Sequence, residues 1–401
     1  MKTRIVATTF HAVAMVALCL TPPATRTADG QTVRNAPVRE ARELLRLGDA
    51  VEVPDWLTFV SEPRLMLDGA GRLFVVPGRD PRVRVLNQDG DFIRYIGGSG
   101  TGPGEFASLY RAGFAGDTLW IQDQFAMRTS FFDTAGIHVR TEANTGRPEM
   151  GSGYARKMPL AGGRQLVVGP PGEAAGGERT RMAVAIGPRD GPGRDTVASV
   201  LESSSMEIEG VGSFAHRLVV APPRHTRLPD GTGVLVVDWA IDVPDRLTLR
   251  RYDLDGRPAG ESTLDFKLRE IPDDVREAYI DEGVAMVKRT AESLPETVGE
   301  QVPANLRGAV IQGSIIPDHY PPIESFFVTR SGQVWLRVAT SENDRSEWVV
   351  IGADGSPEFR VSAPPGVTFK AADGDRVWGT GTTNLDIPYI GLYDLITPEG
   401  R

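Results

Sequence analysis

Cysteine is almost absent from this chain, in which Cys19 is the only one among 401 residues. Beyond that position the chain can form neither a disulfide nor a thiolate metal site, so its stability must come from an apolar core. Basic residues are also few, with 44 Lys and Arg against 53 Asp and Glu. The resulting net charge of −9 argues against nucleic acid as a partner, because a phosphate backbone needs a basic face.

Long apolar runs are confined to the N-terminus. Lys2 and Arg4 precede an apolar run from Ile5 to Leu20, and small residues and prolines follow it. This order is typical of a secretory signal peptide, so we predict that residues 1–28 are removed and that the protein is exported, either periplasmic or secreted. Two alternatives remain open: a buried N-terminal helix, and a lipid anchor at Cys19, which the preceding Leu18 disfavours. No later run is long enough to span a bilayer.

The common catalytic signatures are missing as well. The chain has no Gly-x-Ser-x-Gly, no His-Glu-x-x-His and no P-loop, and the glycine-rich stretch 97–104 opens no helix. The histidines that follow the signal segment lie far apart, without the spacing of metal ligands: His138, His216, His225 and His319. The sequence therefore predicts no cofactor, no metal site and no identifiable catalytic residue.

Glycine and proline are abundant, at 45 and 30 residues, and they are spread along the whole chain. They mark a repeated unit, in which a Gly/Asp turn precedes an apolar strand and a further strand ends in another Gly turn. The apolar strands begin near positions 73, 119, 166, 234, 334 and 377. A period of roughly 40 to 50 residues built from short strands is that of a propeller blade. We predict an all-β fold, a six-bladed β-propeller over residues 50–401, preceded by a linker at 29–49.

The first unit carries a family resemblance. Its strand Leu73–Val76, its turn Asp89–Phe92 and the following Gly97–Phe106 resemble the NHL-repeat pattern of six-bladed bacterial propellers. The likeness is closest in the first unit and weaker in the later ones. It implies the fold, but it says little about function, because members of this family include binding scaffolds, sensors, hydrolases and lyases.

Ring closure can also be predicted. The last unit reaches Arg401 just after its third strand, and Ala50–Trp56 belongs to no unit. We expect this segment to supply the missing outer strand of the sixth blade, where Pro54 suits an edge position.

Two segments interrupt the repeat. Residues 169–178 are rich in Gly and Pro and predict a long loop in the third unit. Residues 268–315 predict a mostly helical insertion between blades four and five, with acidic residues after Pro272 and basic residues further on, as the helix dipole favours. Both segments are expected at the same end of the central channel, either as a lid or recognition element or as a structural cap.

Polar residues predicted at that end are the candidate ligand-binding residues. Asp123 and Asp238 end the second strands of their units, and Asn384 offers an amide; Asp318, His319 and Tyr320 stand beside the insertion. Turn-forming aspartates and a polar loop are the alternative interpretations. The leading hypothesis is a monomeric binding propeller for an unknown protein or small-molecule ligand. The alternative is a metal-dependent hydrolase or lyase, similar to lactonase-type propellers, with converging carboxylates in the channel.

Overall fold

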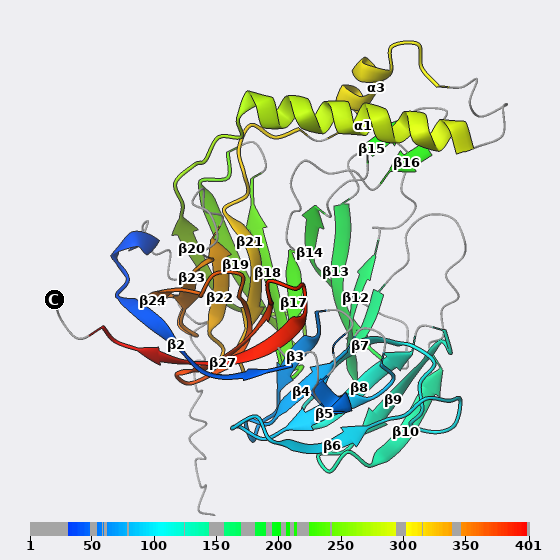
Figure 1. Cartoon of the computed structure of the whole chain (residues 1–401), viewed down its shortest axis with the longest axis vertical. Helices are drawn as coiled ribbons and strands as arrows, with labels where there is room; N and C mark the ends of the chain where they lie inside the picture. Colours follow the sequence, from blue (N-terminus) through cyan, green and yellow to red (C-terminus); the bar gives the residue numbers. More distant parts are fainter. Residues whose placement is uncertain are drawn as a thin grey trace, which may run out of the picture.

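The structure is a computed structural model in which the described residues are 31–48, 54–57, 59, 62–77, 80–123, 125–143, 156–169, 181–189, 195–201, 206–208, 212–214, 224–240, 243–293, 302–314, 316–338 and 346–398. The predicted signal peptide at 1–28 lies outside the described residues, as does nearly all of the predicted 169–178 loop. The chain forms antiparallel sheets in a propeller-like arrangement, with a small helical unit at one end (Figure 1).

Four separate sheets follow one another along the chain, and in each the strand order is the chain order. The first two contain β3 (Arg64–Leu67), β4 (Leu73–Val76), β5 (Val83–Leu86) and β6 (Phe92–Ile96), then β7 (Leu109–Ala115), β8 (Thr118–Asp123), β9 (Arg128–Phe132) and β10 (His138–Ala143). The next two contain β11 (Arg156–Pro159), β12 (Arg164–Gly169), β13 (Arg181–Pro188) and β14 (Asp195–Leu201), then β17 (His225–Arg227), β18 (Gly233–Trp239), β19 (Arg246–Asp253) and β20 (Pro258–Asp265). The short β1 (Gln31–Thr32) pairs in parallel with β20.

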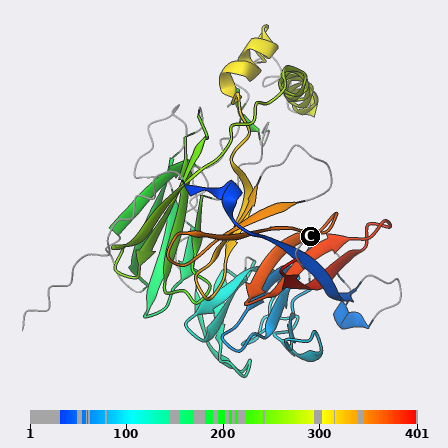
Figure 2. The ribbon, with the colours of Figure 1, turned by 90° about the vertical axis from the view of Figure 1, so that its left-hand side faces the viewer.

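A fifth sheet has eight strands and joins the two ends of the chain. Its order is β21 (Ile323–Val328), β22 (Val334–Val338), β23 (Glu347–Ile351), β24 (Pro357–Ser362), β2 (Val38–Leu47), β27 (Pro388–Ile396), β26 (Arg376–Thr382) and β25 (Thr368–Asp373). The N-terminal strand β2 lies at its middle, parallel to β24 and antiparallel to β27. Figures 1 and 2 show β2 in blue beside the red C-terminal strand.

This pairing corrects two predictions. The strand beside β27 comes from Val38–Leu47 and not from Ala50–Trp56, whose described residues, 54–56, lead into the 3-10 helix Asp55–Leu57. The expected linker at 29–49 therefore contains a sheet strand, preceded by a second 3-10 helix, Val33–Asn35. Half of the ten residues of β2 are charged, including the adjacent pairs Arg39–Glu40 and Arg42–Glu43, so its composition does not indicate a strand. Its more covered positions, Arg39, Ala41, Leu45 and Leu47, do not carry a continuous apolar pattern.

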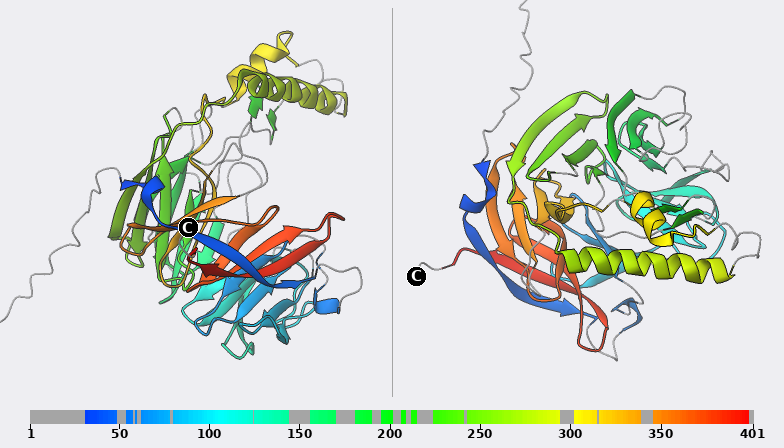
Figure 3. Two further views of the ribbon diagram at one scale, coloured as in Figure 1. Left: turned by 60° about the vertical axis from the view of Figure 1, so that its left-hand side comes forward. Right: turned by 90° about the horizontal axis from the view of Figure 1, so that it is seen from above.

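Apolar clusters join most neighbouring sheets, and the Gln122 amide, which donates to the carbonyl of Lys157, links the β7–β10 sheet to the β11–β14 sheet. In β4, Leu73 and Val75 pack toward β26 and β27, whereas Phe74 and Val76 pack toward β7 and β8. Successive strand residues point to opposite faces, so a strand buried on both faces packs against two neighbouring sheets at once. The other clusters join β12 and β13 to β18, β18 and β19 to β22, and β22 and β23 to β26 and β27. Seen from above, the sheets surround a common centre (Figure 3, right).

The helical unit, which we call the cap, has a core of its own. It contains α1 (Asp273–Ser293) and α3 (Leu306–Gly313), both within the segment predicted to be helical, and the hairpin β15 (Met206–Ile208) with β16 (Gly212–Phe214). Met206 and Ile208 pack against α1 and α3, where Val287 and Val310 are fully buried. Two separate connections of the ring thus build one cap, which stands above the sheets in Figures 1 and 2.

Strand direction distinguishes the two ends of the ring. The connection from β20 to β21 carries α1 and α3, so the first strand of each unit starts at this cap end. Because the strands are antiparallel, the turns after the second strands, such as β8–β9, also lie at the cap end. The hairpins between first and second strands lie at the opposite end, which we call the hairpin end.

Candidate functional site

Asp123 forms the turn that follows β8. Its side chain is fully buried, and one carboxylate oxygen accepts hydrogen bonds from the backbone N–H groups of Phe125, at 3.1 Å, and Ala126, at 3.0 Å. The other oxygen accepts from the N–H of Ala107 at 2.7 Å, which ties the turn to the segment entering β7. Backbone donors thus occupy both oxygens, so Asp123 shapes this loop and has little capacity left for a metal or ligand.

Asp238 lies between two guanidinium groups on its own sheet. Its carboxylate pairs with Arg224 at 3.1 Å and with Arg250 at 3.4 Å. Arg250 also pairs with Glu261 at 3.0 Å, and Arg224 packs over the ring of Trp239 at 3.9 Å. Asp238 is therefore part of an ion-pair network across β18, β19 and β20, and these cations compete with any metal for its charge.

Asp318, His319 and Tyr320 form the neck that carries the cap. His319 pairs with Glu270 in an isolated β-bridge, and the N–H of Tyr320 donates to the carbonyl of Arg269 at 2.9 Å. The Arg269 guanidinium lies 3.9 Å from the centre of the Tyr320 ring, and the Asp318 carboxylate pairs with Arg276 of α1. The three predicted residues thus lie where the chain segment leaving the cap pairs with the segment that enters it.

Asn384 lies on an exposed turn between β26 and β27. The hydroxyl of Thr383 accepts the N–H groups of Leu385 and Ile387, both at 3.2 Å, and Asp386 adopts a positive φ of 58°. Within the described ranges, no group of three or more His, Cys, Asp or Glu side chains could hold a metal ion. The six predicted residues therefore divide into turn-forming, ion-pairing and neck positions.

The turns that follow the second strands β8, β18 and β26 each carry an exposed apolar side chain. Phe125 is 77% exposed, Leu385 is 68% exposed and Val243 is 51% exposed. They follow the second strands β8, β26 and β18, so all three lie at the cap end. Among the described residues, Met127 and Asp386 are the only residues other than glycine with a positive φ, and both belong to these turns. Strained backbone of this kind collects at sites of ligand or partner binding.

A second feature, which the sequence analysis missed, is a cavity of about 210 Å³ inside the channel near the hairpin end. First strands from five parts of the ring line it: β3, β7, β17, β21 and β25. Its basic residues are Arg227, Arg330 and Lys370, and Phe114, Phe326 and Ala372 supply apolar surface. The available signal was the frequency of basic residues in the first strands, which is hard to recognise before the strands are placed around an axis.

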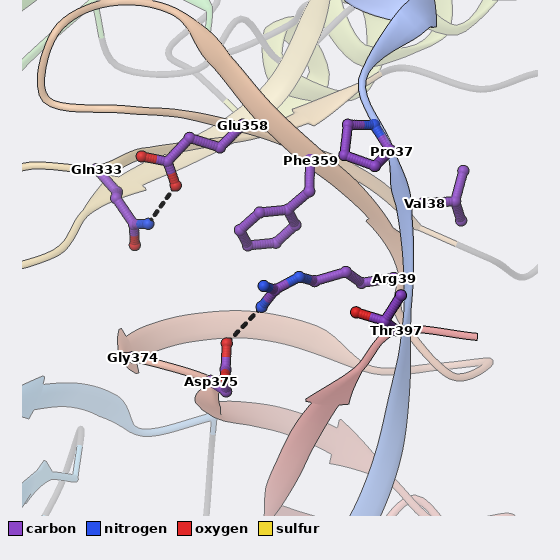
Figure 4. A pocket seen from close by; sticks show the side chains of 9 residues that line it. All are labelled: Pro37, Val38, Arg39, Gln333, Glu358, Phe359, Gly374, Asp375 and Thr397. Carbon is purple, nitrogen blue, oxygen red and sulfur yellow. Dashed lines mark hydrogen bonds and ion pairs between the residues drawn. The ribbon is translucent and has the colours of Figure 1, made fainter. Parts of the chain in front are cut away.

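A third feature is a cavity of about 320 Å³ on the side of the ring, between β2, β24 and the turn before β26 (Figure 4). Arg39 spans it, pairing with Asp375 and lying 4.6 Å from the centre of the Phe359 ring. The Gln333 amide donates to Glu358 at 2.6 Å on the opposite side. Because internal partners engage these polar groups, the cavity is a packing gap beside the closing strand.

Comparisons with known proteins give neither a family nor an activity. No family model matches the chain, and no curated protein matches it. Among solved structures, a proposed exported protein of Bacteroides fragilis is 12% identical, with 90% of this chain and 99% of that chain covered and a TM-score of 0.47. A DUF4221 family member of Bacteroides vulgatus is 10% identical over the same shares, with a TM-score of 0.48. Virginiamycin B lyase of Staphylococcus aureus is 12% identical, covering 84% and 95%, with a TM-score of 0.36.

Proposed function

We propose that this protein is an exported six-bladed β-propeller, similar to the NHL-repeat type, that binds a partner protein at its cap end. Export rests on the signal-like sequence of residues 1–28, and periplasmic and secreted locations are both compatible with it. None of the helices in the described ranges is long and apolar enough to cross a membrane.

The blade count rests on strand pairing. The eight-stranded sheet divides at β2 into a four-stranded half, β21 to β24, and a half formed by β25, β26, β27 and β2. The pairing of β2 with β27 covers Glu40 to Leu47, whereas its parallel pairing with β24 covers only Val38 to Glu40. We therefore assign β2 to the last blade as its outer strand, which gives six blades with the four separate sheets.

The cap supports a binding role because the apolar residues of the sheets are buried without any contribution from it. No residue of α1, α3 or β15 belongs to the apolar clusters that join the described sheets. Ordering such a segment costs about 1–2 kcal/mol per residue in backbone entropy alone, offset here by the separate core around Val287 and Val310. A unit built in this way is typical of a recognition element held above a rigid scaffold.

The observation that carries the proposal is the set of exposed apolar tips at the cap end. Phe125, Leu385 and Val243 stand on separate turns, and buried or local hydrogen bonds fix the turns of the first two. Rigid apolar side chains on fixed loops form contact points for a protein surface, because burying them costs little further ordering. We expect a monomer that contacts its partner through these tips and the cap.

The metal-dependent hydrolase is less well supported, since Asp123 and Asp238 are engaged by backbone N–H groups and by arginines. The test of this alternative is metal content, by mass spectrometry on protein purified without chelator, with thermal melts in the presence and absence of EDTA. We expect the melting temperature to stay the same with EDTA. A stoichiometric divalent ion together with a lower melting temperature would favour the enzyme.

The binding proposal is tested with the double variant Phe125→Ser and Leu385→Ser. The control is Ile137→Ser, because Ile137 is 65% exposed but lies in the β9–β10 turn at the hairpin end. Each tagged protein is cross-linked in extracts of the exported fraction, and cross-linked residues are mapped by mass spectrometry. We expect specific cross-links from the cap end with the wild type and the control, and their loss with the double variant. Equal cross-linking of all three proteins would refute the proposal.

A further inference from the structure

The cavity near the hairpin end of the channel is lined by three basic side chains, Arg227, Arg330 and Lys370, and its described lining contains no acidic residue. Basic residues outnumber acidic ones in the first strands of the ring, although the whole chain has a net charge of −9. The basic ones are Arg64, Arg111, Arg156, Lys157, Arg227 and Lys370, and the acidic ones are Glu324 and Asp373. Low-dielectric walls focus a field of one sign within such a channel, which attracts anions.

Arg227 crosses the channel from β17 to β7. Its guanidinium donates to the carbonyl of Phe114 and lies 4.9 Å from the centre of the Trp120 ring. A Cβ at Gly113 would lie 1.7 Å from Nη2 of Arg227, so this glycine provides the space for the guanidinium. Burial lowers the pKa of Arg227 to about 10, and Asp230 acts in the opposite direction. Arg227 therefore remains a cation at neutral pH.

Arg330 reaches into the same cavity from the turn after β21. Its Nη1 is buried and has no hydrogen-bond partner among the residues that the structure describes, and its Nη2 lies 3.9 Å from the carboxylate of Asp117, which is 80% exposed. A buried N–H of a charged group without an acceptor is unfavourable, so an anionic acceptor that enters the cavity would be bound there. Lys370, the third cation, pairs at 2.8 Å with Glu62, which is 58% exposed and also accepts the hydroxyl of Thr380 at 2.6 Å.

The rest of the lining is apolar. Phe114, Phe326, Met66 and Ala372 face the same cavity as the three cations. Guanidinium groups bind planar carboxylates through paired N–H donors. The apolar side chains of the cavity favour a ligand whose remaining part is a hydrocarbon. The volume of about 210 Å³ is smaller than the ~300–1,000 Å³ of typical drug-sized sites, so it suits a compact molecule.

We propose that the hairpin end of the channel binds a small organic carboxylate, with Arg330 and Arg227 holding the carboxylate group and the apolar first-strand residues holding its hydrocarbon part. Lys370 adds a further positive charge at the edge of the site. This site is separate from the surface proposed for a partner protein, because it lies at the opposite end of the ring. Either proposal can therefore fail without the other.

The probes are benzoate, its neutral isostere benzamide, and inorganic phosphate, each titrated calorimetrically into the full exported chain. We expect benzoate to bind and to raise the melting temperature, and benzamide to bind at least tenfold more weakly. Arg330→Gln should weaken benzoate binding at least tenfold, and Lys370→Met should weaken it severalfold. The matched control is Arg246→Gln, because Arg246 is a 67% exposed arginine of β19 outside the cavity.

Several outcomes would overturn this assignment. Absence of benzoate binding at millimolar concentration would exclude the site, and equal affinities for benzoate and benzamide would remove the role of the cations. Phosphate binding without benzoate binding would exclude the hydrocarbon part of the proposal. Wild-type affinity in a folded Arg330→Gln variant, verified by its melting curve, would also refute it.

Discussion

The carboxylate of Asp123 accepts the backbone N–H of Ala107 at 2.7 Å, joining the turn after β8 to the segment that enters β7. The same carboxylate holds the turn that displays Phe125. Asp123, which the sequence analysis predicted to bind a ligand, is hydrogen-bonded within the turn that carries Phe125.

Substitution of Asp123 should destabilise the ring. Asp123→Ala removes the acceptor of three backbone N–H groups, so we expect a loss of about 3 kcal/mol in the free energy of unfolding, measured with urea. Asp123→Asn keeps one carbonyl oxygen and should lose less. Asp89→Ala is the control, because Asp89 is 71% exposed and its pair with Arg376 should contribute below about 1 kcal/mol. Similar losses for Asp123→Ala and Asp89→Ala would contradict this account.

Gly113 and Arg227 should be energetically coupled. A Cβ at position 113 displaces the guanidinium from Phe114 and Trp120, so Gly113→Ala should cost about 2 kcal/mol of stability. In the background of Arg227→Ala the same change should cost almost nothing, because the displaced group is already absent. The double-mutant cycle measures this coupling. Additive losses would show that Gly113 serves another purpose.

The cap should unfold independently of the ring. Val310→Asp places a carboxylate in a fully buried apolar site, which should abolish the packing of α1 against α3. The chain has six tryptophans, at positions 56, 120, 239, 335, 348 and 378, and none lies in the cap. Helical circular dichroism should therefore fall while the tryptophan-detected melt stays within a few degrees. A single coincident transition shifted strongly downward would show that ring and cap are one cooperative unit.

Closure through β2 should be essential to the ring. A chain starting at residue 31 should fold normally, whereas a chain starting at residue 48 should lose its cooperative melt and aggregate. Its β24 and β27 would lack the strand that covers their edges. Size-exclusion chromatography and melting curves of the two chains make the comparison. A monomeric, cooperatively folding chain from residue 48 would rule out this role.

Alkaline destabilisation should depend on Tyr393. Burial, followed by the nearby Tyr389 and Glu43, raises the pKa of Tyr393 above its ordinary value of about 10. The folded state therefore retains a proton that the unfolded chain releases. This contribution is complete below pH 10 and is lost by up to about 1.4 kcal/mol per pH unit above it. Unfolding at pH 9 and pH 11 should show a smaller loss for Tyr393→Phe than for the wild type, and equal losses would disprove the assignment.

The sequence by itself determined the strand-rich repeat, its interruption by helices and the pattern of turns. The starting positions near 73, 119, 166, 234, 334 and 377 all fall in or beside a strand, because Gly turns and apolar runs are local signals. The helical segment was visible for the same reason, with acidic residues opening α1.

Only the tertiary structure decided which segment closes the sheet, what the candidate residues do and where the cations gather. The polar β2 is a strand because β24 and β27 offer it open edges, which its own composition does not reveal. Asp123 accepts backbone N–H groups and Asp238 pairs with arginines because the pairing of neighbouring strands in the folded sheets places these partners beside them. Arg227 and Arg330 meet in one cavity because the ring brings first strands around a common axis, a long-range contact that no local pattern encodes.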